Sequence, residues 1–94
     1  MQVQWTEKAN RNLDEVEAYI TQDNPEAAMR VVLKVIRFVE ELADSPGLGR
    51  PGRILGTREL VIGGTPFLVP YRVRGEVIEI LAVLHGAMKW PTRL

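Results

Sequence analysis

The sequence contains no cysteine and only one histidine among its 94 residues. Without cysteine, neither a disulfide framework nor a thiolate metal site can form. One histidine leaves too few ligands for a structural zinc site, and no Ser/His/Asp or Cys/His set suited to nucleophilic catalysis is apparent. We therefore expect a protein that binds no metal ion and no cofactor.

Long apolar runs are also missing. No stretch approaches the roughly 18 apolar residues of a membrane-spanning helix, and the N-terminus lacks the basic and then apolar pattern of a signal peptide. Internal repeats and low-complexity segments are not found either. These absences predict a cytoplasmic protein that does not bind membranes.

The chain is long enough for one hydrophobic core and too short for two, so we expect a single domain over residues 1–94. Its net charge is zero, but residues 1–45 carry −4 and residues 46–94 carry +4. A basic half favours an anionic partner. The alternative is that the helices simply carry solvating Asp and Glu while the strands do not, and both interpretations stay open.

Two helices are predicted in the first half of the chain. Thr6 can cap a helix that ends near Gln22, and Asn24 followed by Pro25 can begin a second helix that ends at Ser45-Pro46-Gly47. Apolar residues recur at helical spacing in both segments. The chain link between the helices is short, so we expect an antiparallel helical hairpin.

Strands are predicted on either side of this hairpin, at residues 1–5, 57–62, 67–73 and 77–84, with residues 47–56 as a loop. Residues 1–5 are expected to form an edge or parallel strand. The fold class is therefore α+β. We expect a small, mostly antiparallel sheet in the order strand, helix, helix, strand, strand, strand, with the N-terminal helical hairpin packed on one face.

Gly75 and Glu76 fit a two-residue type II′ turn between the last two strands. This turn places Arg72 opposite Glu79 and Leu68 opposite Val83. One face of the hairpin is then nearly all apolar and needs cover from the helices. The other face carries apolar residues mixed with charges: Leu68, Arg72, Arg74, Val77, Glu79, Leu81, Val83 and His85. Pro70 lacks an N–H group, so a bulge or an unpaired position is expected there.

Arg72 and Arg74 share the mixed face and are candidates for binding phosphate or an acidic protein surface. The alternative is that Arg72 pairs with Glu79 and that Arg74 lies in solvent near the turn. His85 is the only side chain with a pKa near neutrality, and it could act as an acid or base in phosphodiester cleavage; a structural or contact role is the alternative.

Arg50 and Arg53 lie on the Gly-rich loop and could approach the same face, or remain solvated. Trp90 could stack on a base or fold back onto the core. Glu59 and Glu79 alone do not make a convincing acid–base pair.

Several short motifs, taken in order, resemble one protein superfamily. They are Asn24-Pro25 at the start of the second helix, Gly49-Arg50, Thr57-Arg58-Glu59-Leu60, Tyr71-Arg72-Val73 and Val83-Leu84-His85-Gly86. Their order and spacing over almost the whole chain resemble the RelE/ParE toxins of bacterial type II toxin–antitoxin systems. The resemblance implies a cognate antitoxin that wraps the toxin in a hetero-oligomer.

Two activities occur in that superfamily. RelE-like members cut messenger RNA on the ribosome, and ParE-like members poison DNA gyrase. Arg72 matches the arginine that RelE-like nucleases place at the scissile phosphate, and His85 falls near a position where some members keep a catalytic residue. No Tyr or second His follows His85, however, and the loop before Arg58 has no lysine cluster. The resemblance therefore favours the ParE branch.

We expect a gyrase poison, with a ribosome-dependent mRNA endoribonuclease as the alternative and an inactive relative that only binds antitoxin as a third possibility. Arg72 and His85 would be catalytic only in the nuclease. The expected target-binding residues are Arg50, Arg53, Arg58, Arg72, Arg74, Lys89 and Trp90. Leu68, Leu81 and Val83 are the apolar residues expected to lie under the antitoxin.

Overall fold

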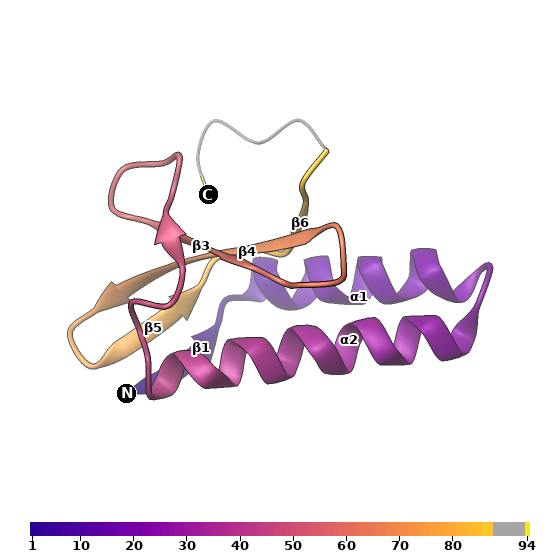
Figure 1. The fold of residues 1–94 in the computed structure, drawn as a ribbon, viewed down its shortest axis with the longest axis horizontal. Coiled ribbons are helices and arrows are strands. Elements are labelled where there is room, and N and C mark those ends of the chain that lie inside the picture. Colours follow the sequence, from indigo (N-terminus) through magenta and orange to yellow (C-terminus); the bar gives the residue numbers. More distant parts are fainter. Residues whose placement is uncertain (88–93) are drawn as a thin grey trace.

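The computed structural model describes residues 1–87 and Leu94. The elements in these residues, with their bounds, are β1 (Gln2–Trp5), α1 (Glu7–Thr21), α2 (Pro25–Glu40), the 3₁₀ turn η1 (Glu41–Ala43), β2 (Arg50–Pro51), β3 (Arg58–Val61), β4 (Phe67–Arg74), β5 (Val77–Ile80) and β6 (Leu84–His85). Figure 1 shows the helical hairpin α1–α2 covering one side of the sheet.

Both helices begin at the residues that the sequence predicts. The Thr6 hydroxyl accepts a hydrogen bond from the Ala9 N–H (3.1 Å), and the Asn24 side chain accepts one from the Ala27 N–H (3.1 Å). These bonds satisfy amide groups that have no partner inside the helix. Pro25 occupies the first turn of α2, where its missing N–H costs nothing.

The described strands form one mixed sheet in the order β1-β5-β4-β3-β2, with β6 also paired to β4. The β1–β5 pair is parallel and all other pairs are antiparallel. The α+β prediction is therefore confirmed, and β1 is indeed a parallel edge strand. The strand β2 was not predicted and lies inside the segment expected to be a loop. The strand expected over residues 77–84 is divided into β5 and β6.

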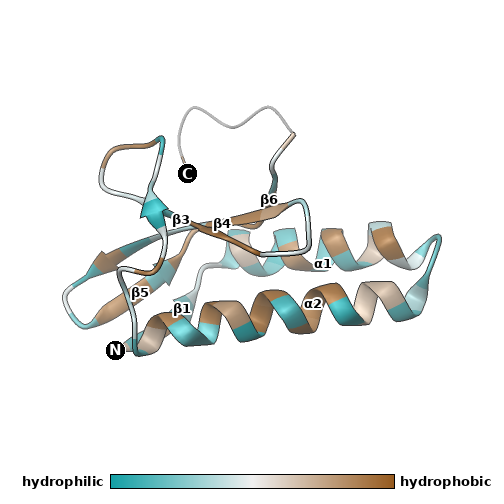
Figure 2. Cartoon of the chain, in the orientation of Figure 1, coloured by the Kyte–Doolittle hydropathy of each residue, from teal (hydrophilic) through white to brown (hydrophobic). Residues whose placement is uncertain are grey.

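The core fills the space between the helical hairpin and the sheet. Figure 2 shows apolar positions recurring along α1, α2, β4 and β5. The buried cluster consists of Ala9, Val35, Val39, Leu42, Leu60, Ile62, Phe67, Val69, Tyr71, Ile78, Ile80 and Val83. Removing one large apolar side chain from water contributes about 1.5 to 3 kcal/mol to the stability of the folded state.

No helix in residues 1–87 is long and apolar enough to cross a membrane.

The turn between β4 and β5 follows the prediction. Gly75 has a positive φ of 60°, and no non-glycine residue among residues 1–87 has a positive φ, which matches Gly75 at the first position of a type II′ turn. Arg72 lies opposite Glu79 and Arg74 lies opposite Val77, as expected. The face of the sheet that carries Glu59, Leu68, Arg72 and Glu79 points away from the helices, and we call it the open face.

The predicted register fails further along the same hairpin. Leu68 lies opposite Leu84, not Val83, because β5 ends at Ile80 and residues 81–83 bulge before β6 begins. The Leu81 N–H donates to the Pro70 carbonyl (2.9 Å), and Pro70 has no N–H to return a second bond. The missing donor breaks the ladder here, and the extra residue exchanges the two faces.

Helix α1 holds the bulge in place. The Thr6 hydroxyl donates to the Ile80 carbonyl (2.7 Å), and the Val83 N–H donates to the Asn12 side-chain oxygen (3.1 Å). As a result Val83, which was expected on the open face, belongs to the core. Leu84 was expected in the core and is only partly buried. His85 also changes sides, with consequences for the candidate site.

Candidate functional site

The open face contains a buried carboxylate, that of Glu59, whose side chain is 3% exposed. Glu59 lies in β3 opposite Arg50 of β2, which brings the two side chains together. Its Oε1 accepts hydrogen bonds from Nη2 and Nε of Arg50 (3.2 and 3.4 Å), and its Oε2 accepts from the backbone N–H and Nε of Arg53 (2.9 and 3.3 Å). Both carboxylate oxygens are therefore satisfied without water.

These contacts determine the charge of Glu59. Burial raises the pKa of its carboxyl group, but the hydrogen bond from the Arg53 backbone and the contacts with the Arg50 and Arg53 side chains outweigh burial, so that the pKa lies below the ordinary value. Glu59 is thus an anion that holds two arginines at one place on the open face.

A second cluster of the same residue types lies along β4 and β5. Nε of Arg72 donates to Oε1 of Glu79 (2.6 Å), and Nε of Arg74 lies 3.7 Å from the same oxygen. The hydrogen bond from Arg72 is the largest contribution to the lowered pKa of Glu79. The cross-strand pairing of Arg72 with Glu79 that the sequence offered as an alternative is therefore present in the structure.

Arg58 does not join these arginines. It lies opposite Tyr71 and thus projects from the other side of the sheet, where its Nη1 donates to the Gly49 carbonyl (2.8 Å). The Tyr71 hydroxyl accepts from the Gly49 N–H and donates to the Pro46 carbonyl, both at 2.8 Å. Burial raises the pKa of Tyr71. Arg58 and Tyr71 therefore position the segment that leads into β2.

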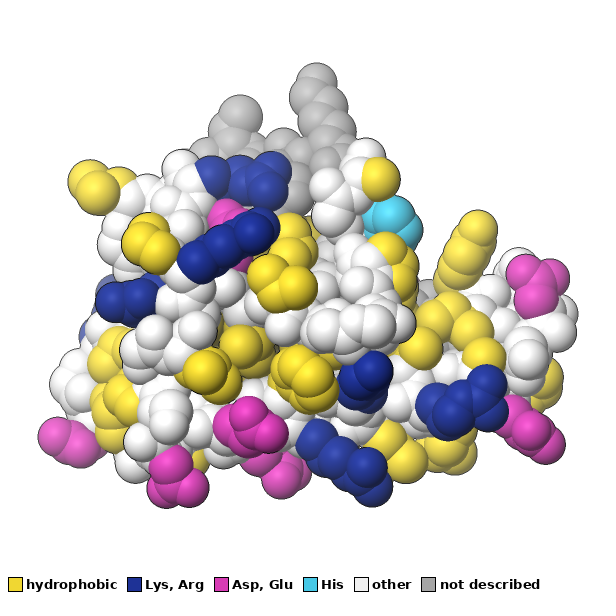
Figure 3. Space-filling view, in the orientation of Figure 1, with side chains coloured by type: hydrophobic (Ala, Val, Ile, Leu, Met, Phe, Trp, Pro, Cys, Tyr) yellow, Lys and Arg dark blue, Asp and Glu magenta, His cyan; other side chains and the backbone are white. Residues whose placement is uncertain are grey.

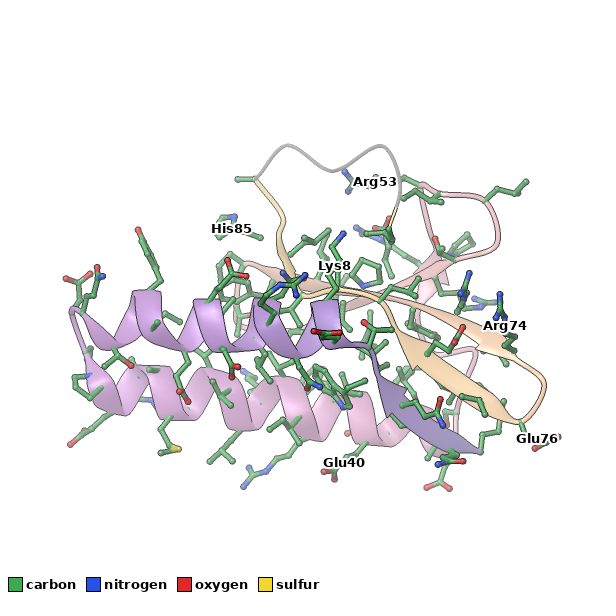
Figure 4. All side chains as sticks on the ribbon, turned by 180° about the vertical axis from the view of Figure 1, so that it is seen from behind. Lys8, Glu40, Arg53, Arg74, Glu76 and His85 are labelled. Atoms are coloured by element: carbon green, nitrogen blue, oxygen red, sulfur yellow. The ribbon has the colours of Figure 1, made fainter. Side chains whose placement is uncertain are left out.

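His85 lies away from the arginine clusters. It pairs with Phe67, whose side of β4 is opposite to that of Arg72, and the two rings meet edge to face with centroids 5.6 Å apart. Its Nδ1 accepts a hydrogen bond from the Ala87 N–H (3.0 Å). In Figure 4, His85 lies over the middle of α1, whereas Arg74 lies near the β4–β5 turn. The prediction that His85 and Arg72 share a face is wrong, because the bulge at residues 81–83 reverses the alternation.

An apolar groove of about 810 Å³ lies beside His85. It runs between the helical hairpin and the segments around the β3–β4 turn and β6. The residues that line it include Val16, Tyr19, Ile20, Val31, Phe67, Val83 and His85. Tyr19 is 72% exposed there. This groove was not predicted from the sequence. The one signal for it is Tyr19, which stands beside Ile20 on the apolar stripe of α1.

The three residues expected under an antitoxin are buried by the chain itself: Leu68, Leu81 and Val83 each have at most 8% of their surface exposed. Lys89 and Trp90 fall outside the described residues. Figure 3 shows basic side chains gathered above the region of β2 and β3, with an acidic group among them, while the helical layer carries both signs.

Metal chemistry has no support among residues 1–87, since they contain no group of three or more His, Asp or Glu side chains placed to hold an ion. What the open face offers instead is four arginines, Arg50, Arg53, Arg72 and Arg74, arranged around two carboxylates. Such a face can hydrogen-bond to a partner in a fixed geometry.

Comparison with known proteins places these features in context. Residues 3–90 match the family model described as the ParE toxin of the type II toxin–antitoxin system parDE. The chain is 49% identical over 89 residues to Y4kP of Sinorhizobium fredii, a protein named as a candidate toxin, with 95% of this chain and 92% of the relative covered. It is 34% identical over 86 residues to toxin RelE2 of Caulobacter vibrioides, with 92% and 96% covered.

Two solved structures of toxin–antitoxin systems also contain chains that resemble this one. The chromosomal ParDE toxin–antitoxin system from P. aeruginosa contains a chain that superposes with a TM-score of 0.81 at 34% identity, covering 90% of this chain and 95% of that one. The RelBE2 toxin–antitoxin complex from Mycobacterium tuberculosis gives a TM-score of 0.66 at 28% identity, covering 89% and 95%.

Proposed function

The chain belongs to the ParE toxin family of type II toxin–antitoxin systems, and we propose that it poisons DNA gyrase in the cytoplasm and is held inactive by a cognate antitoxin. Residues 1–94 would act as one toxin domain. The observation that carries the choice of gyrase over RNA is the separation of Arg72 and His85 onto opposite faces of the sheet.

Cleavage of RNA needs an acid or base close to the group that steadies the phosphate charge. Arg72 is the candidate for the phosphate, and it donates to Glu79 on the open face. His85 is the candidate acid or base, and its Nδ1 is already bonded to the Ala87 N–H beside α1. This separation does not favour joint action of the two residues on one phosphate, which supports the gyrase proposal.

The charge of the open face supports a protein target as well. The arginines Arg50, Arg53, Arg72 and Arg74 contact Glu59 or Glu79. Binding to a nucleic acid backbone relies on many uncompensated positive charges, and the formal net charge of this chain is zero. Arginines that are held in place by carboxylates are better suited to a complementary protein surface than to a nucleic acid backbone.

A ribosome-dependent endoribonuclease is the second candidate. It is favoured by the similarity to toxin RelE2 and to the RelBE2 complex. In that case Arg72 and His85 would both be needed for RNA cleavage, and the segment from β6 onward would have to change its position to bring them together.

We propose that the antitoxin occupies the apolar groove between the helical hairpin and β6. The similar chains in solved structures belong to toxin–antitoxin systems, and the groove offers exposed apolar surface for a helix or strand of such a partner. The groove differs from the antitoxin site expected from the sequence, which consisted of Leu68, Leu81 and Val83. Only Val83 of that set lines the groove, while Leu68 and Leu81 are buried elsewhere.

The antitoxin site is tested by affinity. Tyr19→Ala should weaken binding of the cognate antitoxin at least about tenfold, since exposed tyrosines at the centre of an interface contribute strongly. Met29→Ala is the matched control, because Met29 is 58% exposed on α2 and does not line the groove. Equal affinities for both variants would place the antitoxin elsewhere.

The target is tested by DNA supercoiling with purified gyrase and with toxin freed from antitoxin. We expect inhibition with trapped cleaved DNA, retained in His85→Ala and lost in Arg72→Glu. No effect on gyrase, together with ribosome-bound mRNA cleavage that needs Arg72 and His85, would establish the nuclease instead. No growth arrest on expression would indicate a relative that only binds antitoxin.

A further inference from the structure

Residues 52–57 form a closed loop that stands off the open face, on the side of the sheet away from the helices (Figure 1). The Gly52 N–H donates to the Thr57 carbonyl (2.8 Å), and the Thr57 N–H and hydroxyl donate to the Ile54 carbonyl (3.1 and 2.6 Å). A methyl group on Gly52 would collide with the Thr57 side chain. These contacts give the loop a defined shape.

Glu59 fixes this loop to the sheet. Its Oε2 accepts the Arg53 backbone N–H (2.9 Å), and both oxygens bind arginine side chains from the chain that enters the loop. Because the carboxylate is buried in β3, these bonds are shielded from water and are stronger than the same contacts in solvent. The loop is therefore held at its base as well as closed upon itself.

The tip of the loop carries Leu55, whose side chain is 100% exposed. Other exposed leucines of the chain keep part of their surface against neighbours: Leu48, just before β2, is 52% exposed. A single exposed leucine is ordinary. A leucine with its whole side chain in water, at the tip of a loop ordered by a buried carboxylate, offers its full apolar surface to a partner at little cost in backbone entropy.

We infer that the loop 52–57 is a preformed contact surface for the toxin's protein target, that Leu55 enters an apolar pocket of that target, and that Glu59 is the positioning residue of the loop. The pocket would be bordered by carboxylates or carbonyl groups that accept from Arg53 and Arg50. An aliphatic tip has neither the hydrogen-bonding groups nor the stacking face that nucleic acid recognition uses. The inference rests on the proposed function for the identity of the target, gyrase.

The test compares Leu55→Ser with Leu48→Ser in growth arrest and in gyrase supercoiling. Leu55→Ser should raise the toxin concentration for half inhibition at least about tenfold, as expected for loss of an apolar anchor, and Leu55→Met should restore most of the activity. Leu48→Ser should change inhibition less than twofold, and antitoxin affinity should be unchanged in all three, because the antitoxin groove lies elsewhere.

The positioning role of Glu59 is tested by combining substitutions. If Glu59 acts through the loop tip, Glu59→Gln weakens inhibition, and the double variant Glu59→Gln/Leu55→Ser is no weaker than Leu55→Ser alone. Additive losses in the double variant, with antitoxin affinity intact, would overturn that role. Unchanged growth arrest by Leu55→Ser would overturn the contact surface.

The two proposals can fail separately. Wild-type toxin that inhibits gyrase together with a fully active Leu55→Ser variant would remove the loop inference and leave the gyrase target. Wild-type toxin that arrests growth without inhibiting gyrase would remove the gyrase target, and the growth arrest of the Leu55 and Leu48 variants would still decide whether the loop contacts the target.

Discussion

Two clusters on the open face are built from the same residue types and differ in burial. In the first, Glu59 is enclosed by the protein and binds Arg50 and Arg53. In the second, Glu79 is partly exposed and binds Arg72 and Arg74. Both clusters contain a cross-strand pair, Arg50 with Glu59 and Arg72 with Glu79. The first cluster also connects Arg53 of the loop 52–57 to β3, whereas the second joins only neighbouring strands that the backbone ladder already holds. Clusters of the same residue types therefore differ in role: the Glu59 cluster fixes the position of a loop, and the Glu79 cluster adds little to the structure of the sheet.

The difference follows from solvation. An exposed pair gains little because water and salt screen both charges. A buried carboxylate must find donors inside the protein, and losing them leaves groups that water cannot reach. We therefore expect the first cluster to determine structure and the second to be available to a partner, which leaves Arg72 suited to contact the target.

The largest expected effect is that of Glu59→Ala. Removal of the carboxylate leaves the Arg53 N–H without its acceptor and takes one partner from each of the Arg50 and Arg53 side chains, which should lower the free energy of unfolding by about 2 to 3 kcal/mol. Urea denaturation of the purified variant measures the loss. A loss of stability no larger than that of Glu79→Ala would show that the buried cluster stabilises the fold no more than the exposed one.

Tyr71→Phe should have the next largest effect, about 1 to 2 kcal/mol. The hydroxyl is buried and bridges the Gly49 N–H and the Pro46 carbonyl, which lead into β2 and hence to Arg50. Both backbone groups lose their partner in the variant. The same denaturation experiment provides the value, and a stability equal to wild type would mean that this segment is held by other contacts.

The contribution of Glu59 to stability should depend on pH. Because the folded-state pKa of Glu59 is lower than the ordinary value of 4.5, its contribution is present above that value and is lost as the pH falls through the folded-state pKa. The wild type should exceed Glu59→Gln in stability at pH 7, and the gap should narrow by pH 3, where the protonated acid resembles the amide. A gap that is constant with pH would show that the charge of Glu59 is not what matters.

Glu79→Ala should give the smallest effect of the four. The pair is accessible to water, so removing the carboxylate should change stability slightly at low ionic strength and not at all in 1 M salt. Thermal unfolding at two salt concentrations measures this. A loss that persists in high salt would show that Glu79 stabilises the sheet through more than its charge.

Much of the fold could be predicted because local signals agreed with one another. The residue types of Thr6 and Asn24 predict the two helix caps, and the turn at Gly75 predicts that Arg72 lies opposite Glu79. The register was lost at Pro70, where the sequence showed that a hydrogen bond must fail but not how many residues the opposing strand would insert. The one extra residue in the segment 81–83 determines on which face of the sheet Val83 and His85 lie.

The candidate site was harder to predict because it depends on burial. Arg50 and Arg53 are candidates as loop arginines, and Arg72 is one through the hairpin register and a family motif. Nothing local in the sequence indicates that Glu59 binds both Arg50 and Arg53. Its role comes from the pairing of β2 with β3, a two-residue strand in a segment rich in glycine. The groove beside Tyr19 likewise arises between elements distant in sequence.

The most direct measurement is inhibition of gyrase supercoiling by Glu59→Gln and Glu79→Gln, each purified away from antitoxin and compared with the wild type. We predict that the wild type inhibits, that Glu59→Gln needs at least about tenfold more protein because its loop 52–57 is released, and that Glu79→Gln inhibits like the wild type. Loss of inhibition in Glu79→Gln with full activity in Glu59→Gln, or no inhibition by any of the three, would contradict the account.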